Sequence, residues 1–156
     1  MKKILVLAIS FIIIFSSSSF AKDIFIETRL NNLSFIENYS KANNINNILD
    51  DMLEPPFFYA RTIESIKTYK DNKANFLYIS ELGKTPLFTY FDVYSDDNPE
   101  VVKEFIKNGV NPFAKDYEGL NAADYALMND RINCLIYLID CNASPTIVLD
   151  TQNKLF

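Results

Sequence analysis

The chain has 156 residues, a length that suits one domain, and 49% of them are hydrophobic, which is enough to build a core. Its 20 acidic residues exceed its 15 basic ones, and the resulting net charge of −5 argues against a nucleic-acid partner, which selects basic surfaces. Histidine is absent. Because histidine is the commonest acid–base group and a common zinc ligand, we expect no catalytic residue, no metal site and no cofactor.

Residues 1–21 have the pattern of a secretory signal peptide. Lys2 and Lys3 give a basic start, "ILVLAISFIIIF" is apolar, and small residues stand at Ser19 and Ala21. A retained membrane anchor is the alternative, but the apolar run is shorter than the ~20 residues that a span needs. We therefore expect cleavage after Ala21 and a monomeric mature chain, periplasmic or secreted, that is not inserted in the membrane.

Residues 22–54 are expected to form an N-terminal helical cap, because "NNLSFIENYSKA" and "INNILDDML" both read as helices. Residues 55–80 are interpreted as a divergent repeat. In this repeat "EPPFFYA" opens a first helix, and "IESIKTYKDNKANFLYISEL" contains a second helix and the loop that follows it.

Two regular copies of a repeat follow at residues 81–115 and 116–147. When the copies are aligned, Gly83 falls on Gly119 and, further along, Phe105 falls on Leu138. The first offset is 36 residues and the later one is 33, so the unit has 33 residues and the first copy carries three extra ones near "VYSDDNP". A period of this size indicates a stack of repeated helical units.

The three glycines of the chain fit the helix boundaries of this unit. Gly83 and Gly119 precede the first helix, where a turn needs positive φ. Gly109 is predicted to end the second helix in the left-handed conformation, and Asn142 stands at the matching place in the next copy.

Two further signals support these boundaries. Thr85 and Asn121 stand where the first helix begins, and we predict that their side chains accept backbone N–H groups as N-caps. In the second helix Val102, Phe105 and Ile106 are spaced three and four apart, which predicts a buried apolar stripe.

The stretch "GKTPLF…NPEVVKEFIKNGVNPFAKD" resembles the ankyrin repeat through its second helix and the loop after it. The resemblance implies an all-α fold, a short ankyrin-repeat solenoid of about three helix–turn–helix units over residues 55–156, with a truncated turn at 148–156, behind the N-terminal cap. Phe88 and Asp124 replace the histidine of the family signature. We therefore expect the loss of a hydrogen bond that normally ties neighbouring turns.

The resemblance also implies a protein partner, facing the tips of the turns and the exposed side of each first helix. The partner-binding residues expected here are Glu81, Leu82, Lys84, Asp92, Val93, Tyr94, Tyr117, Glu118, Leu120, Met128 and Asn129. An exposed Tyr117 would be the main anchor, since tyrosine is a common hot-spot residue. The alternative is that it lies flat on its own turn. Phe113 is expected to pack under its loop.

Cys134 and Cys141 both lie in "INCLIYLIDCN", which reads as one helix. Seven residues of helix rise about 10.5 Å, which is farther than a disulfide spans, so we predict two separate thiols with Cys134 buried. The pairs at residues 50–51 and 96–97 are two adjacent aspartates each. They are interpreted as a helix-end cluster and a solvated loop, because the spacing of a calcium-binding EF-hand is missing.

These observations favour an exported, non-catalytic module that binds a periplasmic or envelope protein through the concave surface of its repeats. A secreted effector, or an immunity protein that neutralises a toxin, is the alternative. A small enzyme is a third hypothesis, which the absence of histidine disfavours.

Overall fold

The computed structural model describes residues 23–91 and 96–147. Within these ranges the chain forms seven α-helices and one 3-10 helix, and no strand. In chain order they are α2 (Ile24–Arg29), α3 (Leu33–Ala42), η1 (Pro56–Tyr59), α4 (Ile63–Asp71), α5 (Pro86–Tyr90), α6 (Pro99–Lys107), α7 (Ala122–Met128) and α8 (Ile132–Asp140). The expected signal peptide, at residues 1–21, and the expected truncated turn, at residues 148–156, lie outside the described residues.

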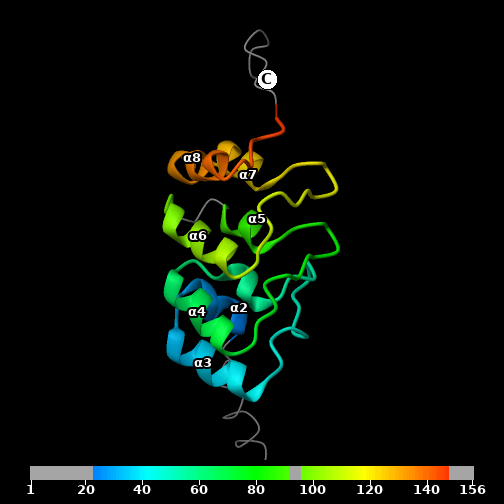
Figure 1. The fold of residues 1–156 in the computed structure, drawn as a ribbon. Helices are drawn as coiled ribbons and strands as arrows, with labels where there is room; N and C mark the ends of the chain where they lie inside the picture. The colour runs from blue at the N-terminus through cyan, green and yellow to red at the C-terminus, as the bar shows by residue number, and fades with distance from the viewer. Residues whose placement is uncertain (1–22, 92–95, 148–156) are drawn as a thin grey trace, which may run out of the picture.

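The helices stack in two rows (Figure 1). The short first helices α2, η1, α5 and α7 contact one another in sequence, and so do the second helices α3, α4, α6 and α8. Each first helix also packs on the second helix of its own pair. The expected fold is confirmed, because this is an all-helical stack in which each unit contacts its neighbours, as in a repeat solenoid.

The second expected cap helix, "INNILDDML", is not a helix. Residues 50–54 form a tight turn in which Leu53 has a φ of 58°. The Asp50 carboxylate accepts the backbone N–H groups of Met52 at 2.9 Å and Glu54 at 3.0 Å. This local bonding gives the backbone an alternative to the helical ladder.

The predicted backbone conformation of the glycines is confirmed. Gly83, Gly109 and Gly119 have φ values of 77°, 99° and 81°, and Asn142, at the place that matches Gly109, has a φ of 65°. The chain thus uses its glycines where L side chains are disfavoured.

One of the two predicted N-caps is confirmed. Asn121 accepts hydrogen bonds from the backbone of Ala123 at 2.8 Å and of Asp124 at 3.2 Å. Thr85 stands at the matching helix start, but its hydroxyl is buried without a hydrogen-bond partner among the described residues. The prediction for Thr85 is therefore wrong, although the helix begins there and has proline at its first position.

We expected a hydrogen bond between neighbouring turns to be lost where Phe88 and Asp124 replace the histidine of the family signature. For Asp124, in the second regular copy, this expectation is wrong. Asp124 is fully buried and accepts bonds from Thr146, through N at 2.6 Å and Oγ1 at 2.7 Å, and from Ile147 N at 2.8 Å. A carboxylate can accept several donors at once, so it replaces the histidine as a tie to the following loop. At the matching place in the first copy, Phe88 packs edge-on against Tyr125 at a ring-centroid distance of 5.0 Å.

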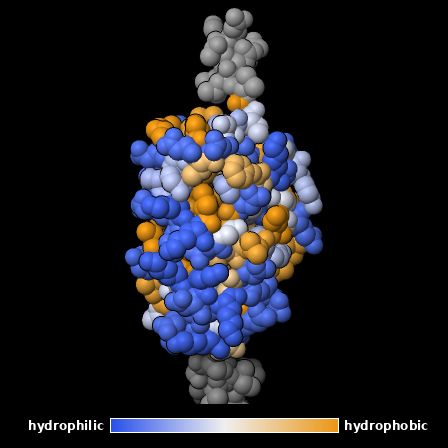
Figure 2. Space-filling model, viewed as in Figure 1, coloured by the Kyte–Doolittle hydropathy of each residue, from blue (hydrophilic) through white to orange (hydrophobic). Residues whose placement is uncertain are grey.

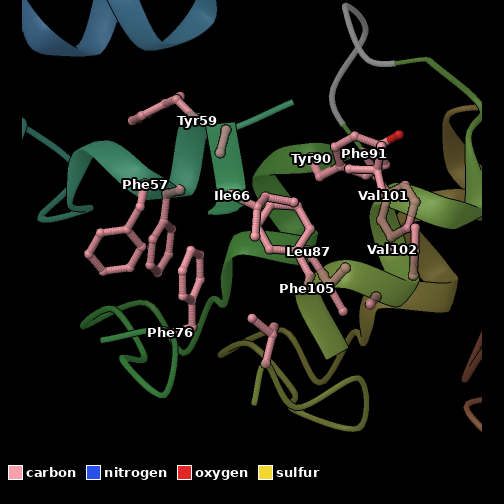
Figure 3. Packing of buried hydrophobic residues seen from close by; sticks show 14 of the residues in the cluster. Phe57, Tyr59, Ile66, Phe76, Leu87, Tyr90, Phe91, Val101, Val102 and Phe105 are labelled. Atoms are coloured by element: carbon pink, nitrogen blue, oxygen red, sulfur yellow. The ribbon is translucent and has the colours of Figure 1, made fainter. Parts of the chain in front are cut away.

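The core follows the stack and combines aliphatic side chains with a series of aromatic rings (Figure 3). Phe76 lies 5.2 Å from Phe57 and 6.1 Å from Phe105, measured between ring centroids, so one chain of contacts joins successive units. Val102 and Phe105 are fully buried and Ile106 is half-buried, which confirms the predicted stripe. Leu138, aligned with Phe105, is also fully buried.

Both cysteines are free thiols and Cys134 is buried, as predicted. Asp97, in the second aspartate pair, is partly exposed and also has a structural role. Its carboxylate accepts the backbone N–H groups of Asn133 and Cys134, each at 2.9 Å, and so caps the start of α8 across the stack.

The outer side of α8 exposes a run of isoleucines at positions 132, 136 and 139, and Figure 2 shows a hydrophobic patch over this helix. Over the described ranges, no helix combines the length and the hydrophobicity that a membrane crossing needs.

Candidate functional site

Three hairpin turns with one geometry project on the side of the stack opposite the second helices (Figure 1). In each, the first residue donates its N–H to the carbonyl of the fifth and accepts the N–H of the fourth, which has positive φ. These turns are residues 50–54, 80–84 and 116–120. The first of these turns lies directly before η1, as the other two lie directly before α5 and α7.

The first and third hairpin turns are built by the same side-chain device. The carboxylate of Asp116 accepts the backbone of Glu118 at 2.9 Å and of Leu120 at 3.0 Å, and its second oxygen accepts the phenol of Tyr125 at 2.8 Å. Asp50 repeats these bonds, and its second oxygen accepts the phenol of Tyr59. Each aspartate therefore stabilises its own hairpin turn and also fixes the position of one tyrosine ring, Tyr59 for Asp50 and Tyr125 for Asp116.

Between the hairpin turns and the first helices lies a concave pocket of about 380 Å³. Its walls come from three successive units, and the lining residues are Met52, Glu54, Tyr59, Lys84, Phe88, Thr89, Tyr125 and Asn129. Three of them stand at one repeated position, since Tyr59, Thr89 and Tyr125 are each the fourth residue after a helix N-cap. The regular stacking of units therefore builds this pocket.

The pocket contains a buried carboxylate. Glu54 is only 4% exposed, and Thr89 Oγ1 donates to its Oε2 at 3.1 Å. Burial raises the pKa of the Glu54 carboxyl, although the bond from Thr89 opposes this shift. Lys84 lies on the same wall, but its ammonium is placed over the Tyr125 ring, 5.5 Å from the centroid.

The tyrosines of the pocket are held as protonated phenols. Burial and the hydrogen bond to Asp50 raise the pKa of Tyr59. Burial and the hydrogen bond to Asp116 likewise raise the pKa of Tyr125. At neutral pH both rings therefore present uncharged apolar faces, with the hydroxyl group already bonded inside the protein.

The expected partner-binding residues fall into three groups. Those that are exposed are Glu81, Leu82, Tyr117, Glu118 and Met128, and those that are half-buried are Lys84, Leu120 and Asn129. Asp92, Val93 and Tyr94 lie outside the described residues. The structure places Lys84 and Asn129 in the concave pocket, while Leu82, Tyr117 and Glu118 line a smaller hollow of about 150 Å³ beside it.

The two aromatic expectations have different outcomes. Tyr117 is 79% exposed, so it does not lie flat on its own turn. Phe113 is 55% exposed, and the expectation that it packs under its loop is wrong. Its neighbours Pro112 and Ala114 occupy the buried side of this loop instead, which leaves the ring between them facing outward.

The sequence reasoning missed most of the concave pocket, namely Met52, Glu54, Tyr59, Phe88, Thr89 and Tyr125. One signal could have found two of these residues. Asp50 precedes Tyr59 by nine positions, and Asp116 precedes Tyr125 by the same nine. This repeated spacing marks two hairpin turns of one design.

Residues 93–139 match the family model of ankyrin repeats (many copies). The match covers α6 and α7 and nearly all of α8. A comparison with curated proteins finds no match. The chain therefore contains an ankyrin repeat at residues 93–139, set within a short all-helical solenoid.

Proposed function

We propose that this protein is an exported, non-catalytic binding module, and that its concave surface binds a protein of the periplasm or envelope. Ankyrin repeats generally mediate protein–protein interactions, and residues 93–139 match that family. The observation that carries the proposal is the concave pocket, to which three successive units contribute side chains.

The composition of this surface suits a protein partner. Tyr59, Phe88 and Tyr125 supply aromatic walls, and the exposed Tyr117 stands on the neighbouring hairpin turn. Binding hot spots are enriched in such aromatic side chains within recessed sites, with polar groups around them. The wall positions are also pre-organised by the aspartate bonds of the hairpin turns, which lowers the entropy lost on binding.

One observation supports a non-catalytic role. Burial and a hydrogen bond to Asp97 raise the pKa of the Cys134 thiol, so at neutral pH it is protonated and poorly nucleophilic.

Export is supported by the pattern of residues 1–21. The test is mass spectrometry of the N-terminus of the protein recovered from the periplasm and from the medium. Export with cleavage gives a chain that begins at Lys22. A chain recovered only from the cytoplasm with Met1 in place refutes this part of the proposal.

The binding role is tested by affinity capture from an envelope extract, using residues 22–156 as bait. Met52 and Tyr117 are exposed on the concave side, so Met52→Ala and Tyr117→Ala should fold normally and retain less of the captured protein. Lys103→Ala, on the exposed side of α6, is the matched control and should retain it fully. A captured protein that all three variants retain equally would contradict binding through the concave surface.

A further inference from the structure

The concave pocket has a carboxylate where an uncharged side chain would be easier to bury. Glu54 is the fifth residue of the first hairpin turn and is 4% exposed. Among the described residues it forms no ion pair, and the side chains that act on it by hydrogen bonding are the neutral hydroxyls of Thr89, 3.1 Å from Oε2, and Tyr59. A buried charge without a counter-ion is costly, and a departure of this kind from the rules of stable packing is expected at a functional site.

Lys84 is the cation that acts on Glu54, but it does not neutralise the carboxylate by direct contact. Its ammonium lies over the Tyr125 ring, 5.5 Å from the centroid, and its charge only partly opposes the effect of burial on the pKa of Glu54. The carboxyl therefore retains unused capacity to pair with an incoming cation.

The aromatic walls already bind cations of the chain itself. The Arg29 guanidinium lies 3.9 Å from the centroid of Tyr59, and Lys84 lies over Tyr125. Ring faces attract cations through their quadrupole, and the attraction grows when water is excluded. The rings that line this pocket are therefore suited to hold a cationic group near Glu54.

The charged groups around the pocket also favour a cationic ligand. The carboxylates that act on Glu54 or on the two tyrosines are Asp50, Asp116, Glu118 and Glu54 itself. The cations that act on these groups are Arg29 and Lys84. This negative excess raises the local concentration of a cation and opposes an anion.

We propose that the concave pocket receives a lysine or arginine side chain of the bound protein, with its charged head at the Glu54 carboxylate and its methylene stem against Met52, Tyr59 and Phe88. The volume of about 380 Å³ accommodates such a side chain. A long basic side chain is amphipathic, with an apolar stem and a cationic end, and it matches both the apolar walls and the buried charge. An apolar side chain would exclude water from the Glu54 carboxylate without supplying a positive charge to it.

This inference rests on the proposed binding function, and it is tested by selecting binders from a random heptapeptide library on immobilised residues 22–156. Enriched peptides should contain a lysine or arginine. Replacing that residue by norleucine should lower the affinity by about thirtyfold or more, the effect expected for loss of one partner of a buried charge pair.

The protein side of the same pair is tested with Glu54→Gln, which keeps the shape and removes the charge. It should weaken the basic peptide about as much as the norleucine replacement does, and the two changes together should cost little more than either alone. Glu64→Gln removes the same charge from the exposed side of α4 and should leave binding unchanged.

Two results would overturn the inference while leaving the proposed function intact. They are enrichment of peptides without a basic residue, and undiminished binding of the basic peptide to Glu54→Gln. Two other results count against the binding function and the inference together. One is that no peptide is enriched on the wild-type chain, and the other is that the enriched peptides bind Met52→Ala and Tyr117→Ala as tightly as the wild type.

Discussion

The Oδ1 atom of Asp124, at the start of α7, accepts the backbone N–H of Thr146, 22 residues later in the loop after α8, at 2.6 Å. The other oxygen of the carboxylate accepts the Thr146 hydroxyl at 2.7 Å and the N–H of Asn121 at 2.7 Å. One buried side chain thus closes the N-terminus of its own helix and fastens the loop that follows the unit. The last described unit of the stack therefore depends on Asp124.

Asp124→Ala should lower the free energy of unfolding by about 2–4 kcal/mol, because one buried donor and several partly buried donors lose a charged acceptor at once. Chemical denaturation of residues 22–156 measures the loss. Asp130→Asn is the control, since that side chain is exposed two residues after α7 and asparagine tolerates the left-handed conformation of this position, a φ of 56°, as aspartate does. It should change stability by less than about 0.5 kcal/mol. Equal effects of the two substitutions would show that the loop does not depend on this carboxylate.

The Asp124 carboxylate should also make the free energy of unfolding depend on pH in the acidic range. Burial opposes its charge, but the hydrogen bonds from Asn121, Ile147 and Thr146 outweigh burial and hold the pKa of Asp124 below its ordinary value of 3.8. A lowered pKa in the folded state adds stability above the unfolded-state value, and this contribution is lost as pH falls through the folded-state pKa. Between pH 5 and pH 3 the wild type should therefore lose more stability than Asp124→Asn, as measured by urea unfolding at each pH. Parallel pH profiles would contradict this.

Glu54 should have the opposite dependence on pH. Burial raises its pKa in the folded state above 4.5, so its charge costs stability as the pH rises through the unfolded-state value. Glu54→Gln should stabilise the free protein by about 0.5–2 kcal/mol at pH 7, in the range usual when a strained binding group is removed. The gain should shrink below pH 4, where the wild-type carboxyl is protonated. Thermal melting at both pH values measures this, and a variant less stable at pH 7 would show that Glu54 is adequately paired without a ligand.

The regular repeats could be predicted from sequence because each boundary has a local cause. Gly83, Gly109 and Gly119 mark positive φ, and Asn121 marks a helix start, so short-range chemistry specifies these units. The first hairpin turn lacks these marks. Leu53 takes the left-handed conformation that glycine takes in the other two turns. The apolar residues of "INNILDDML" have the spacing of a helix, so this stretch was predicted to be helical.

The pocket was harder to predict than the repeats. It needs side chains from three units, and the hairpin turn of the first unit has Leu53 where the other two turns have glycine. Glu54 in particular reads as a surface residue before two prolines. Its burial arises only when the first hairpin turn folds beside Thr89 of the next unit. Tertiary packing of this kind leaves no periodic signal in the local sequence.

Thr85 and Thr146 provide a paired test of a threonine hydroxyl without and with a hydrogen-bond partner. Thr85 is 2% exposed and its hydroxyl has no partner among the described residues, whereas Thr146 donates to Asp124 at 2.7 Å. Thr85→Val should change stability by less than about 1 kcal/mol, or increase it, because no bond is lost and no polar atom stays buried. Thr146→Val should cost about 1–3 kcal/mol, because an acceptor loses its donor. Calorimetric melting of both variants distinguishes these outcomes, and a larger loss for Thr85→Val would show that its hydroxyl is bonded.

Gly83 and Gly119 hold the same position in neighbouring hairpin turns, with φ values of 77° and 81°, but their surroundings differ. A Cβ on Gly83 would lie 2.9 Å from the carbonyl oxygen of Lys115, whereas a Cβ on Gly119 would meet nothing within 4 Å. Gly119→Ala should therefore cost only the strain of a left-handed L residue, about 1–2 kcal/mol. Gly83→Ala should cost a further 1–3 kcal/mol or so, because the clash is with backbone that cannot rotate away.

The strain that lowers the stability of Gly83→Ala should also disturb the binding surface. Leu82, beside Gly83, accepts the N–H of Tyr117 at 3.3 Å, so separating the two hairpin turns breaks a bond that joins them. Chemical denaturation gives the two stabilities, and hydrogen exchange of the Tyr117 amide reports on the contact between the turns. Faster exchange is expected in Gly83→Ala and not in Gly119→Ala. Equal losses of stability and unchanged exchange would show that the turns do not pack closely, and the concave pocket would then lack the rigid rim on which its binding role depends.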